Sequence, residues 1–327
     1  MSETDKSNLI LQISEYLADD LRKVDEHINS ILESDTALVR EVGQYVRSTQ
    51  GKRLRPILAI LASRAFGYKG EDHTKVAAAL ELVHSATLLH DDVIDKAPLR
   101  RGKPTVNARW GDDVAILIAD YLFSHAFNFA LNTSMSPRVL SLICQVTARM
   151  CEGEMFQIEK RDEMLTREDY LRIVRGKTAY LFSACTALGT LLAQAPDQEA
   201  MLMASYGLNF GIAFQITDDT LDMVAADSEI GKPAWADIRN GKQTLPLIYT
   251  WEVAEPGDRE DLIHCWRNGR DPETILNYIR KYRGIEFALE QARRYAESAR
   301  EQLADLPSNP AISMLRDLTA YVVARRS

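Results

Sequence analysis

Turn-forming residues are scarce in this chain. Its 327 residues include only 16 glycines and 11 prolines, too few for a fold of many short strands joined by turns. Hydrophobic residues make up 46% of the chain and charged residues 26%, a composition that excludes intrinsic disorder. Apolar residues recur with helical periodicity almost throughout. We therefore predict an all-α protein with a sizeable core.

Cysteine is also sparse. The four cysteines, Cys144, Cys151, Cys185 and Cys265, lie far apart and form no CxxC pair, which argues against both a zinc ribbon and a disulfide framework. The segment MSETDKSNLI is polar and lacks the basic start and apolar run of a signal peptide. Both observations indicate a cytoplasmic protein.

The chain has no excess of positive charge. Its formal net charge is -8, so no overall basic field would attract nucleic acid or an anionic membrane. We therefore expect no nucleic-acid partner, and any anionic ligand must be bound by local lysines and arginines.

Two uncharged stretches, 178–196 and 200–217, approach the length of a membrane span. Both contain polar side chains, and the second leads directly into Asp218 and Asp219. We interpret both as buried helices. The segments 74–92, 112–131 and 200–222 are apolar around much of their circumference, and we expect them at the centre of a helical bundle.

Helix starts are marked by a capping side chain followed by proline at Ser136-Pro137, Asp271-Pro272 and Asn309-Pro310. Thr166 with Asp169 resembles a capping box. No long linker, low-complexity tract or repeat interrupts the chain. We predict a single domain over residues 1–327.

One acidic pattern occurs twice. Asp91, Asp92 and Asp95 stand in HDDVID, and Asp218, Asp219 and Asp222 stand in TDDTLD. With 25 aspartates in the chain, chance would give about 0.15 matches to DDxxD. Each cluster also ends an apolar helical segment rather than a charged run. A pair of solvated helix ends is therefore the weaker interpretation.

The spacing of each cluster favours a bound cation. On a helix, positions i and i+4 share a face, so the first and third carboxylates repel each other unless a cation or proton neutralises them. A ligand set made only of carboxylate oxygens suits Mg²⁺, which often bridges protein carboxylates to the phosphates of a substrate. The clusters therefore predict Mg²⁺ with a diphosphate.

Basic residues near glycine or proline supply the charge that phosphates require. Any one of them alone is most simply a solvated side chain, but together they suggest two anionic groups and hence two diphosphate substrates. They are Lys52, Arg53 and Arg55 in GKRLRP, Arg100, Arg101 and Lys103 in LRRGKPT, Arg175 and Lys177 in RGKTA, Lys232 in IGKP, and Lys242 in NGKQT.

The motifs GKRLRP, HSATLLHDDVIDKAPLRRGKPT, GKTAYLF, FQITDDTLD and GKQTLPLIY occur in this order between Gly51 and Tyr249. Together they resemble the trans-polyprenyl diphosphate synthases. The resemblance implies an all-α fold around a deep central cavity, usually in a homodimer, with the two clusters facing each other across its mouth. It also implies addition of isopentenyl diphosphate to an allylic diphosphate, with three Mg²⁺ ions per active site.

The resemblance also assigns residues. Asp91, Asp95 and Asp218 would bind Mg²⁺ directly, while Asp92, Asp219 and Asp222 would bind it through water or support the ligands. The allylic diphosphate would be held by Arg100, Lys177, Lys232 and Lys242, and isopentenyl diphosphate by Lys52, Arg55, His84 and Arg101. His90 would be structural. Without the resemblance, His84 would be read as an ordinary core histidine.

A mechanism of ionisation, condensation and elimination follows from this assignment. Lys177 would offset charge on the departing diphosphate, and oxygens of Thr178 and Gln215 would stabilise the allylic cation. An apolar cavity would exclude water that could quench the cation. The released diphosphate would accept the final proton, so no nucleophilic side chain is needed.

Product length should depend on the residues below the first cluster. Ala86, Thr87 and Val83 are small, whereas relatives with short products often carry bulky aromatics there. By this resemblance we expect a long product, hexaprenyl to decaprenyl and most simply octaprenyl diphosphate for a quinone tail, with at most transient membrane contact on release. The cavity floor would lie within residues 140–150. A farnesyl or geranylgeranyl diphosphate synthase is the alternative.

One position departs from the family pattern. Trp235 stands in GKPAWADIRNGK where relatives commonly have glycine, which leaves open the geometry of that loop and the role of Asp237.

Three other functions remain open. A terpene cyclase would use one diphosphate substrate, and a non-catalytic subunit would bind prenyl diphosphates without turnover. A di-iron bundle would use Glu81-x-x-His84, with Asp261-x-x-His264 as an imperfect partner.

Overall fold

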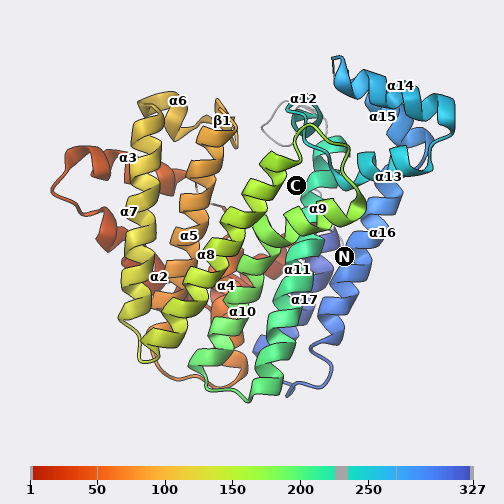
Figure 1. Ribbon diagram of the computed structural model, residues 1–327. Helices are drawn as coiled ribbons and strands as arrows, with labels where there is room; N and C mark the ends of the chain where they lie inside the picture. The colour runs from red at the N-terminus through yellow and green to blue at the C-terminus, as the bar shows by residue number, and fades with distance from the viewer. Residues whose placement is uncertain (1–2, 50, 225–234, 270, 325–327) are drawn as a thin grey trace.

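The computed structural model describes residues 3–49, 51–224, 235–269 and 271–324, and these are almost entirely helical (Figure 1). The all-α expectation is confirmed. The helices are α1 (Glu3–Tyr16), α2 (Ala18–Leu32), α3 (Ala37–Ser48), α4 (Leu54–Ala65), α5 (Asp72–Ile94), α6 (Val106–Trp110), α7 (Asp112–Leu131), α8 (Ser136–Glu159), α9 (Arg167–Val174), the π-helical turn η1 (Arg175–Ala179), α10 (Tyr180–Leu192), α11 (Asp197–Val224), α12 (Ala236–Arg239), α13 (Leu245–Val253), α14 (Pro256–Arg267), α15 (Pro272–Lys281), α16 (Gly284–Glu301) and α17 (Pro310–Ala324).

The strands in the described part of the chain form one short hairpin. Strand β1 (Leu99–Arg100) pairs antiparallel with β2 (Lys103–Pro104), and Arg100 lies opposite Lys103. Between them, Arg101 and Gly102 have positive φ values of 52° and 72°, as expected at the two central residues of a tight hairpin turn. The hairpin follows α5 directly and therefore places Arg100 and Arg101 beside the first aspartate cluster.

Four long or buried helices form the centre of the bundle. Helix α10 packs against α4 and α11, α4 also contacts α5, and α16 and α17 cover α11. At the α4–α10 crossing, a Cβ on Gly189 would lie 2.5 Å from the carbonyl oxygen of Ala59, so only glycine allows this approach. The expected burial of α5, α10 and α11 is confirmed by Val83, Leu188 and Phe210, all fully buried.

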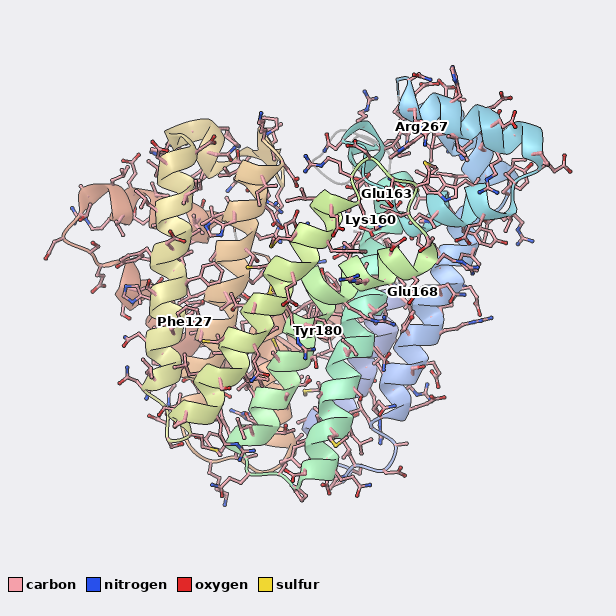
Figure 2. The ribbon with its side chains drawn as sticks, in the orientation of Figure 1. Phe127, Lys160, Glu163, Glu168, Tyr180 and Arg267 are labelled. Atoms are coloured by element: carbon pink, nitrogen blue, oxygen red, sulfur yellow. The ribbon has the colours of Figure 1, made fainter. Side chains whose placement is uncertain are left out.

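Helix α7 is different from the expectation. It was predicted at the centre, but it lies at the edge of the bundle (Figures 1 and 2), where Figure 2 labels the half-buried Phe127. Leu117 is 68% exposed and Leu131 is 55% exposed. Among the described residues, α7 is the one helix long and apolar enough to cross a membrane by length and composition, with 33% of the tested window buried. Its apolar character therefore does not come from full burial within this chain.

The predicted caps are largely confirmed. Thr166 accepts a hydrogen bond from the Asp169 amide and Asp169 accepts one from the Thr166 amide, completing the capping box. The side chains of Asp271 and Asn309 also cap their helices. Ser136 is the exception, because it already belongs to α8 and makes no capping hydrogen bond.

Candidate active site

Both aspartate clusters lie at helix C-terminal ends. Asp91 and Asp92 occupy the last turn of α5 and Asp95 follows it, while Asp218, Asp219 and Asp222 occupy the last two turns of α11. Both ends lie at the top of Figure 1. Carboxylates are unfavourable at a helix C-terminus because the helix dipole is negative there. Nearby cations must therefore offset the charge of each cluster.

The π-helical turn η1 connects the two clusters. The Nζ atom of Lys177 lies 3.9 Å from Oδ2 of Asp91. The next residue, Thr178, donates a hydrogen bond of 2.8 Å to Oε1 of Gln215, and Nε2 of Gln215 donates one of 2.8 Å to Oδ1 of Asp219. Consecutive side chains of η1 thus reach both clusters, which places them around one site. Helical turns of this kind are frequent at functional sites.

In the first cluster, Asp92 is buried and bound by a guanidinium group. Nε of Arg100 lies 2.9 and 3.0 Å from the two carboxylate oxygens, and Nη2 lies 2.8 Å from Oδ1. The negative charge of Asp91 is less well balanced by nearby cations. Its burial raises its pKa to about 6, and the negative charges of Glu154 and Asp95 add to the rise, although Lys177 opposes it. The Asp91 carboxylate is thus destabilised in a way that a bound cation would relieve.

In the second cluster, Asp219 is only 2% exposed and has three donors. Besides Gln215, it accepts hydrogen bonds of 2.7 Å from the Tyr170 hydroxyl and 2.8 Å from Nζ of Lys242. Burial alone would lower the pKa of Lys242, but Asp219 and Asp237 raise it. Burial and Asp219 also raise the pKa of Tyr170 well above its ordinary value, so Tyr170 remains a hydrogen-bond donor.

The segment after the second cluster is held by the same group of residues. The Asp237 amide donates a 3.0 Å hydrogen bond to Oδ2 of Asp222, and Nζ of Lys242 lies 3.2 Å from Asp237. Trp235 adopts a φ of 62°, a left-handed conformation that favours glycine. The Trp235 side chain is partly buried and packs against the hydrophobic cluster that includes Tyr170 and Ile238. Lys232 lies outside the described residues.

A pocket opens beside the first cluster, between α3, α5 and the β-hairpin. It is lined by Gly51, Glu81, His84, Asp92, Arg100 and Arg101, among others. Arg101 is fixed by a 2.8 Å hydrogen bond from its Nη1 atom to the carbonyl oxygen of Thr49. The walls therefore include two arginines, as expected for an anion site.

Further residues predicted for the second diphosphate lie near this pocket. Burial lowers the pKa of His84 well below its ordinary value, and Arg55, Arg101 and Arg100 lower it further, so the imidazole is neutral at pH 7. Arg55 lies over the Phe182 ring at 4.6 Å, and among the described residues its buried Nε atom has no hydrogen-bond partner. A buried donor of this kind is consistent with a ligand that would accept its hydrogen bond. Lys52 reaches the last helix, with Nζ 3.2 Å from the Tyr321 hydroxyl.

The remaining predicted residues lie along α5. Val83 and Ala86 are fully buried, and the half-buried Thr87 donates a hydrogen bond to the carbonyl oxygen of His84. His90 points toward α7, with Nε2 3.6 Å from Asp120, a contact that suits its expected structural role.

Sequence reasoning did not assign a role to Tyr170 or Glu154, and it considered Glu81 only as an iron ligand. Tyr170 and Glu154 carry no motif signal, because each meets its partner through packing between separate helices. Glu81 is buried beside Arg55, and burial raises its pKa while Arg55, Arg53 and Arg101 lower it. Glu81 belongs to the basic pocket.

The structure argues against a di-iron site. His264 and Asp261 lie on α14, which Figure 1 shows far from α5, the helix of Glu81 and His84. Within the described ranges, no group of three His, Cys, Asp or Glu side chains is arranged to hold a metal by itself. The donors that the two clusters offer are all carboxylate oxygens, the ligand type that Mg²⁺ and Ca²⁺ prefer.

Comparison with known proteins agrees with this geometry. Residues 36–282 match the polyprenyl synthetase family. The chain belongs to this family. This chain is 34% identical over 318 residues to octaprenyl diphosphate synthase from Escherichia coli strain K12, an alignment that covers 96% of this chain and 98% of that relative. It is 33% identical to geranylgeranyl diphosphate synthase from Saccharolobus solfataricus, over 96% of this chain and 98% of that one.

Its fold matches solved structures as well. A polyprenyl synthase from Caulobacter crescentus, complexed with calcium and isoprenyl diphosphate, superposes with a TM-score of 0.91 at 33% identity, covering 97% of this chain and 98% of the other. These findings confirm that this chain is a prenyltransferase with the expected all-α fold. The relatives differ in product, so membership of the family does not specify chain length.

Proposed function

We propose that this protein is a trans-prenyltransferase that adds isopentenyl diphosphate units to an allylic diphosphate. The observation that carries the proposal is the linkage of both aspartate clusters by Lys177 and Thr178, beside a pocket lined by arginines. One site thereby offers carboxylates for a metal and enough cations for two diphosphates, with Arg100 between the first cluster and the pocket. A single synthase domain over residues 1–327 is part of the proposal.

The allylic diphosphate and the metal belong to the aspartate clusters. Asp91, Asp95 and Asp218 would hold Mg²⁺ directly, with Asp92, Asp219 and Asp222 behind them. The oxygen-only donor set and the raised pKa of Asp91 support a cation at this place. Arg100, Lys177, Lys232 and Lys242 would hold the diphosphate, and the contacts of Lys177 and Lys242 with the clusters support their assignment.

Isopentenyl diphosphate belongs to the neighbouring pocket, with Lys52, Arg55, His84 and Arg101 as its ligands. A neutral His84 can donate one N–H to a phosphate oxygen, and the guanidinium groups of Arg55 and Arg101 can bind phosphates in a bidentate manner. The Nε atom of Arg55 is buried and has no hydrogen-bond partner among the described residues, which supports its assignment as a phosphate ligand.

In the first step, the allylic C–O bond breaks and its electron pair leaves with the diphosphate. Bound Mg²⁺ would supply positive charge that stabilises this leaving group. Lys177 and Arg100 contribute further positive charge, and oxygens of Thr178 and Gln215 orient their dipoles toward the cation. The double bond of isopentenyl diphosphate then attacks the cation, and loss of a proton to the released diphosphate restores a double bond.

We further propose a long product, from hexaprenyl to decaprenyl and most simply octaprenyl diphosphate. The small size of Ala86 and Val83 on α5 supports this, because neither side chain is bulky enough to close a cavity that extends past them. Ala86→Tyr should shorten the product, as measured by chromatography of the dephosphorylated prenols. Ala86→Ser is the matched control and should leave the length unchanged. An unchanged product with Ala86→Tyr contradicts the assignment.

A homodimer would cover the exposed face of α7 and α8. Besides Leu117 and Leu131, Met155 and Ile158 of α8 are 69% and 43% exposed, and the two helices pack together. Leu117→Glu should lower the mass measured by light scattering to that of a monomer. Met201→Glu, at an apolar side chain that is 71% exposed on α11, is the control and should not change it.

The reaction itself is tested with labelled isopentenyl diphosphate, Mg²⁺ and several allylic primers. The purified protein alone should give elongated prenols. Product from the allylic substrate without isopentenyl diphosphate would instead indicate a terpene cyclase. Absence of turnover in all mixtures would indicate a non-catalytic subunit and refute the proposal.

A further inference from the structure

Helix α8 and η1 cross at two glycines. A Cβ on Gly153 would lie 2.8 Å from the Cα atom of Gly176, and a Cβ on Gly176 would lie 2.7 Å from the Cα atom of Gly153. Any larger residue at either position would separate the two backbones. Each glycine is followed directly by a charged residue, Glu154 on α8 and Lys177 on η1. The close crossing therefore brings these two side chains together.

Glu154 forms an ion pair with Lys177 through Oε2. The side chains are 11% and 23% exposed, respectively, so water screens the pair much less than a surface ion pair. Lys177 also lies 3.9 Å from Oδ2 of Asp91. Its ammonium group is thus shared between a buried glutamate, which none of the roles proposed above uses, and the first carboxylate of the α5 cluster.

The position of Glu154 matters because lysine is flexible. A lysine side chain loses up to about 2 kcal/mol of conformational entropy when it is fixed. Without a second carboxylate, the ammonium group could close fully onto Asp91 and occupy the oxygen that a cation requires. Glu154 holds it at a distance from Asp91 and keeps it at the edge of the cluster.

We propose that Glu154 is a positioning residue of the prenyl transfer reaction. Through its ion pair, Glu154 holds the Lys177 ammonium group where it meets the allylic diphosphate and away from the metal-binding oxygen of Asp91. This inference rests on the proposed function, because it assumes that Lys177 binds the allylic diphosphate. It adds a residue that acts only through Lys177.

A double-mutant cycle on the full-length protein tests this proposal. Glu154→Gln, Lys177→Met and the double variant are assayed with farnesyl diphosphate as primer, saturating isopentenyl diphosphate and Mg²⁺. We expect Glu154→Gln to lower kcat/KM for the primer by about tenfold or more, with KM for isopentenyl diphosphate unchanged. In the Lys177→Met background, the same change should cause no further loss, because its effect depends on the lysine.

Glu152→Gln is the matched control. Glu152 is exposed on the same helix, two residues away, and its substitution should leave all constants unchanged. If Glu154→Gln does not fold, as judged by thermal unfolding, Glu154→Asp takes its place in the cycle. This variant keeps the charge but shortens its reach, and its smaller loss should likewise vanish without Lys177.

The outcomes separate this inference from the proposed function. An inactive wild-type protein, or a Lys177→Met variant as active as wild type, would refute the proposed role of the site. An impaired Lys177→Met variant combined with a normal Glu154→Gln variant would refute only the positioning role. Equal losses from Glu154→Gln with and without Lys177 would also refute it, because Glu154 would then act independently.

Discussion

The two aspartate clusters share one sequence pattern but have different surroundings. At the end of α11, Asp219 is almost completely buried and accepts hydrogen bonds from Tyr170, Gln215 and Lys242. At the end of α5, Asp91 has one cation 3.9 Å away and a pKa raised to about 6. Asp219 is thus stabilised by the protein itself, as its counterpart Asp92 is by Arg100, whereas Asp91 is left in an unfavourable charged state.

This difference indicates a division of roles. A carboxylate with several donors contributes to folding stability and fixes the position of its neighbours. A desolvated carboxylate with weak compensation is costly to the fold, and such groups occur at functional sites, where a ligand relieves the cost. Substitutions in the two clusters should therefore separate activity from stability.

The largest effect is expected from Asp91→Asn. Loss of a residue that we propose as a direct metal ligand should lower kcat by about a hundred- to thousandfold in a prenyl transfer assay. The free energy of unfolding without metal should not fall, because a neutral amide is less costly to bury than a charge. Asp113→Asn, on the exposed start of α7, is the control. A clear loss of stability in Asp91→Asn would contradict the conclusion that the charged Asp91 is costly to the fold.

Asp219→Asn should lower the stability of the fold, which Asp91→Asn should not. The variant removes the charge that pairs with the half-exposed Lys242 and weakens the acceptor of the buried Tyr170 hydroxyl, so we expect a loss of about 2 kcal/mol in the free energy of unfolding. Urea denaturation of the metal-free protein measures it. An unfolding free energy equal to that of wild type would show that the donors around Asp219 contribute nothing to the stability of the fold.

The pH dependence of stability gives a second test of the unfavourable charge on Asp91. The pKa of Asp91 is about 6 in the folded protein and near its ordinary value of about 4 when unfolded. The folded state therefore holds this proton more tightly, which stabilises it at pH 4 and below, and the contribution is lost as the pH rises through 6. Metal-free wild type should lose about 1 to 2 kcal/mol more than Asp91→Asn between pH 4.5 and 7.5. Parallel pH profiles for the two proteins would contradict this.

The smallest effect is expected from Tyr170→Phe. Removing the hydroxyl leaves Asp219 with Gln215 and Lys242, so a loss of about 1 kcal/mol in unfolding free energy is expected, with activity reduced less than in Asp91→Asn. Tyr278→Phe, at a tyrosine on α15 outside the site, serves as the control. Equal stability of Tyr170→Phe and wild type would show that the hydroxyl is not needed to hold Asp219.

Local sequence signals predicted much of the fold. Helical periodicity and capping residues such as Thr166 and Asp271 act within a few residues, so they can be recognised without knowledge of the tertiary structure. The paired DDxxD patterns likewise identified both clusters. Helix α7 was misplaced because an apolar circumference indicates burial but not what provides it: a partner chain would give the same pattern as an enclosed core.

The parts of the site that sequence reasoning missed depend on contacts between distant segments. Tyr170 meets Asp219 across 49 positions, and Glu154 meets Lys177 because two glycines let separate helices touch. The pairing of Arg100 with Asp92 required the tight hairpin after α5. None of these contacts has a spacing rule that one sequence can reveal.

The contact between Lys52 and Tyr321 has a practical consequence. Tyr321 lies six residues before Ser327, the last residue in the sequence, and its hydroxyl is 3.2 Å from the ammonium group of Lys52. A truncation that removed Tyr321 would therefore delete a contact of a lysine that we propose for the isopentenyl diphosphate site. Shortened forms of the protein should accordingly keep α17 (Pro310–Ala324) intact.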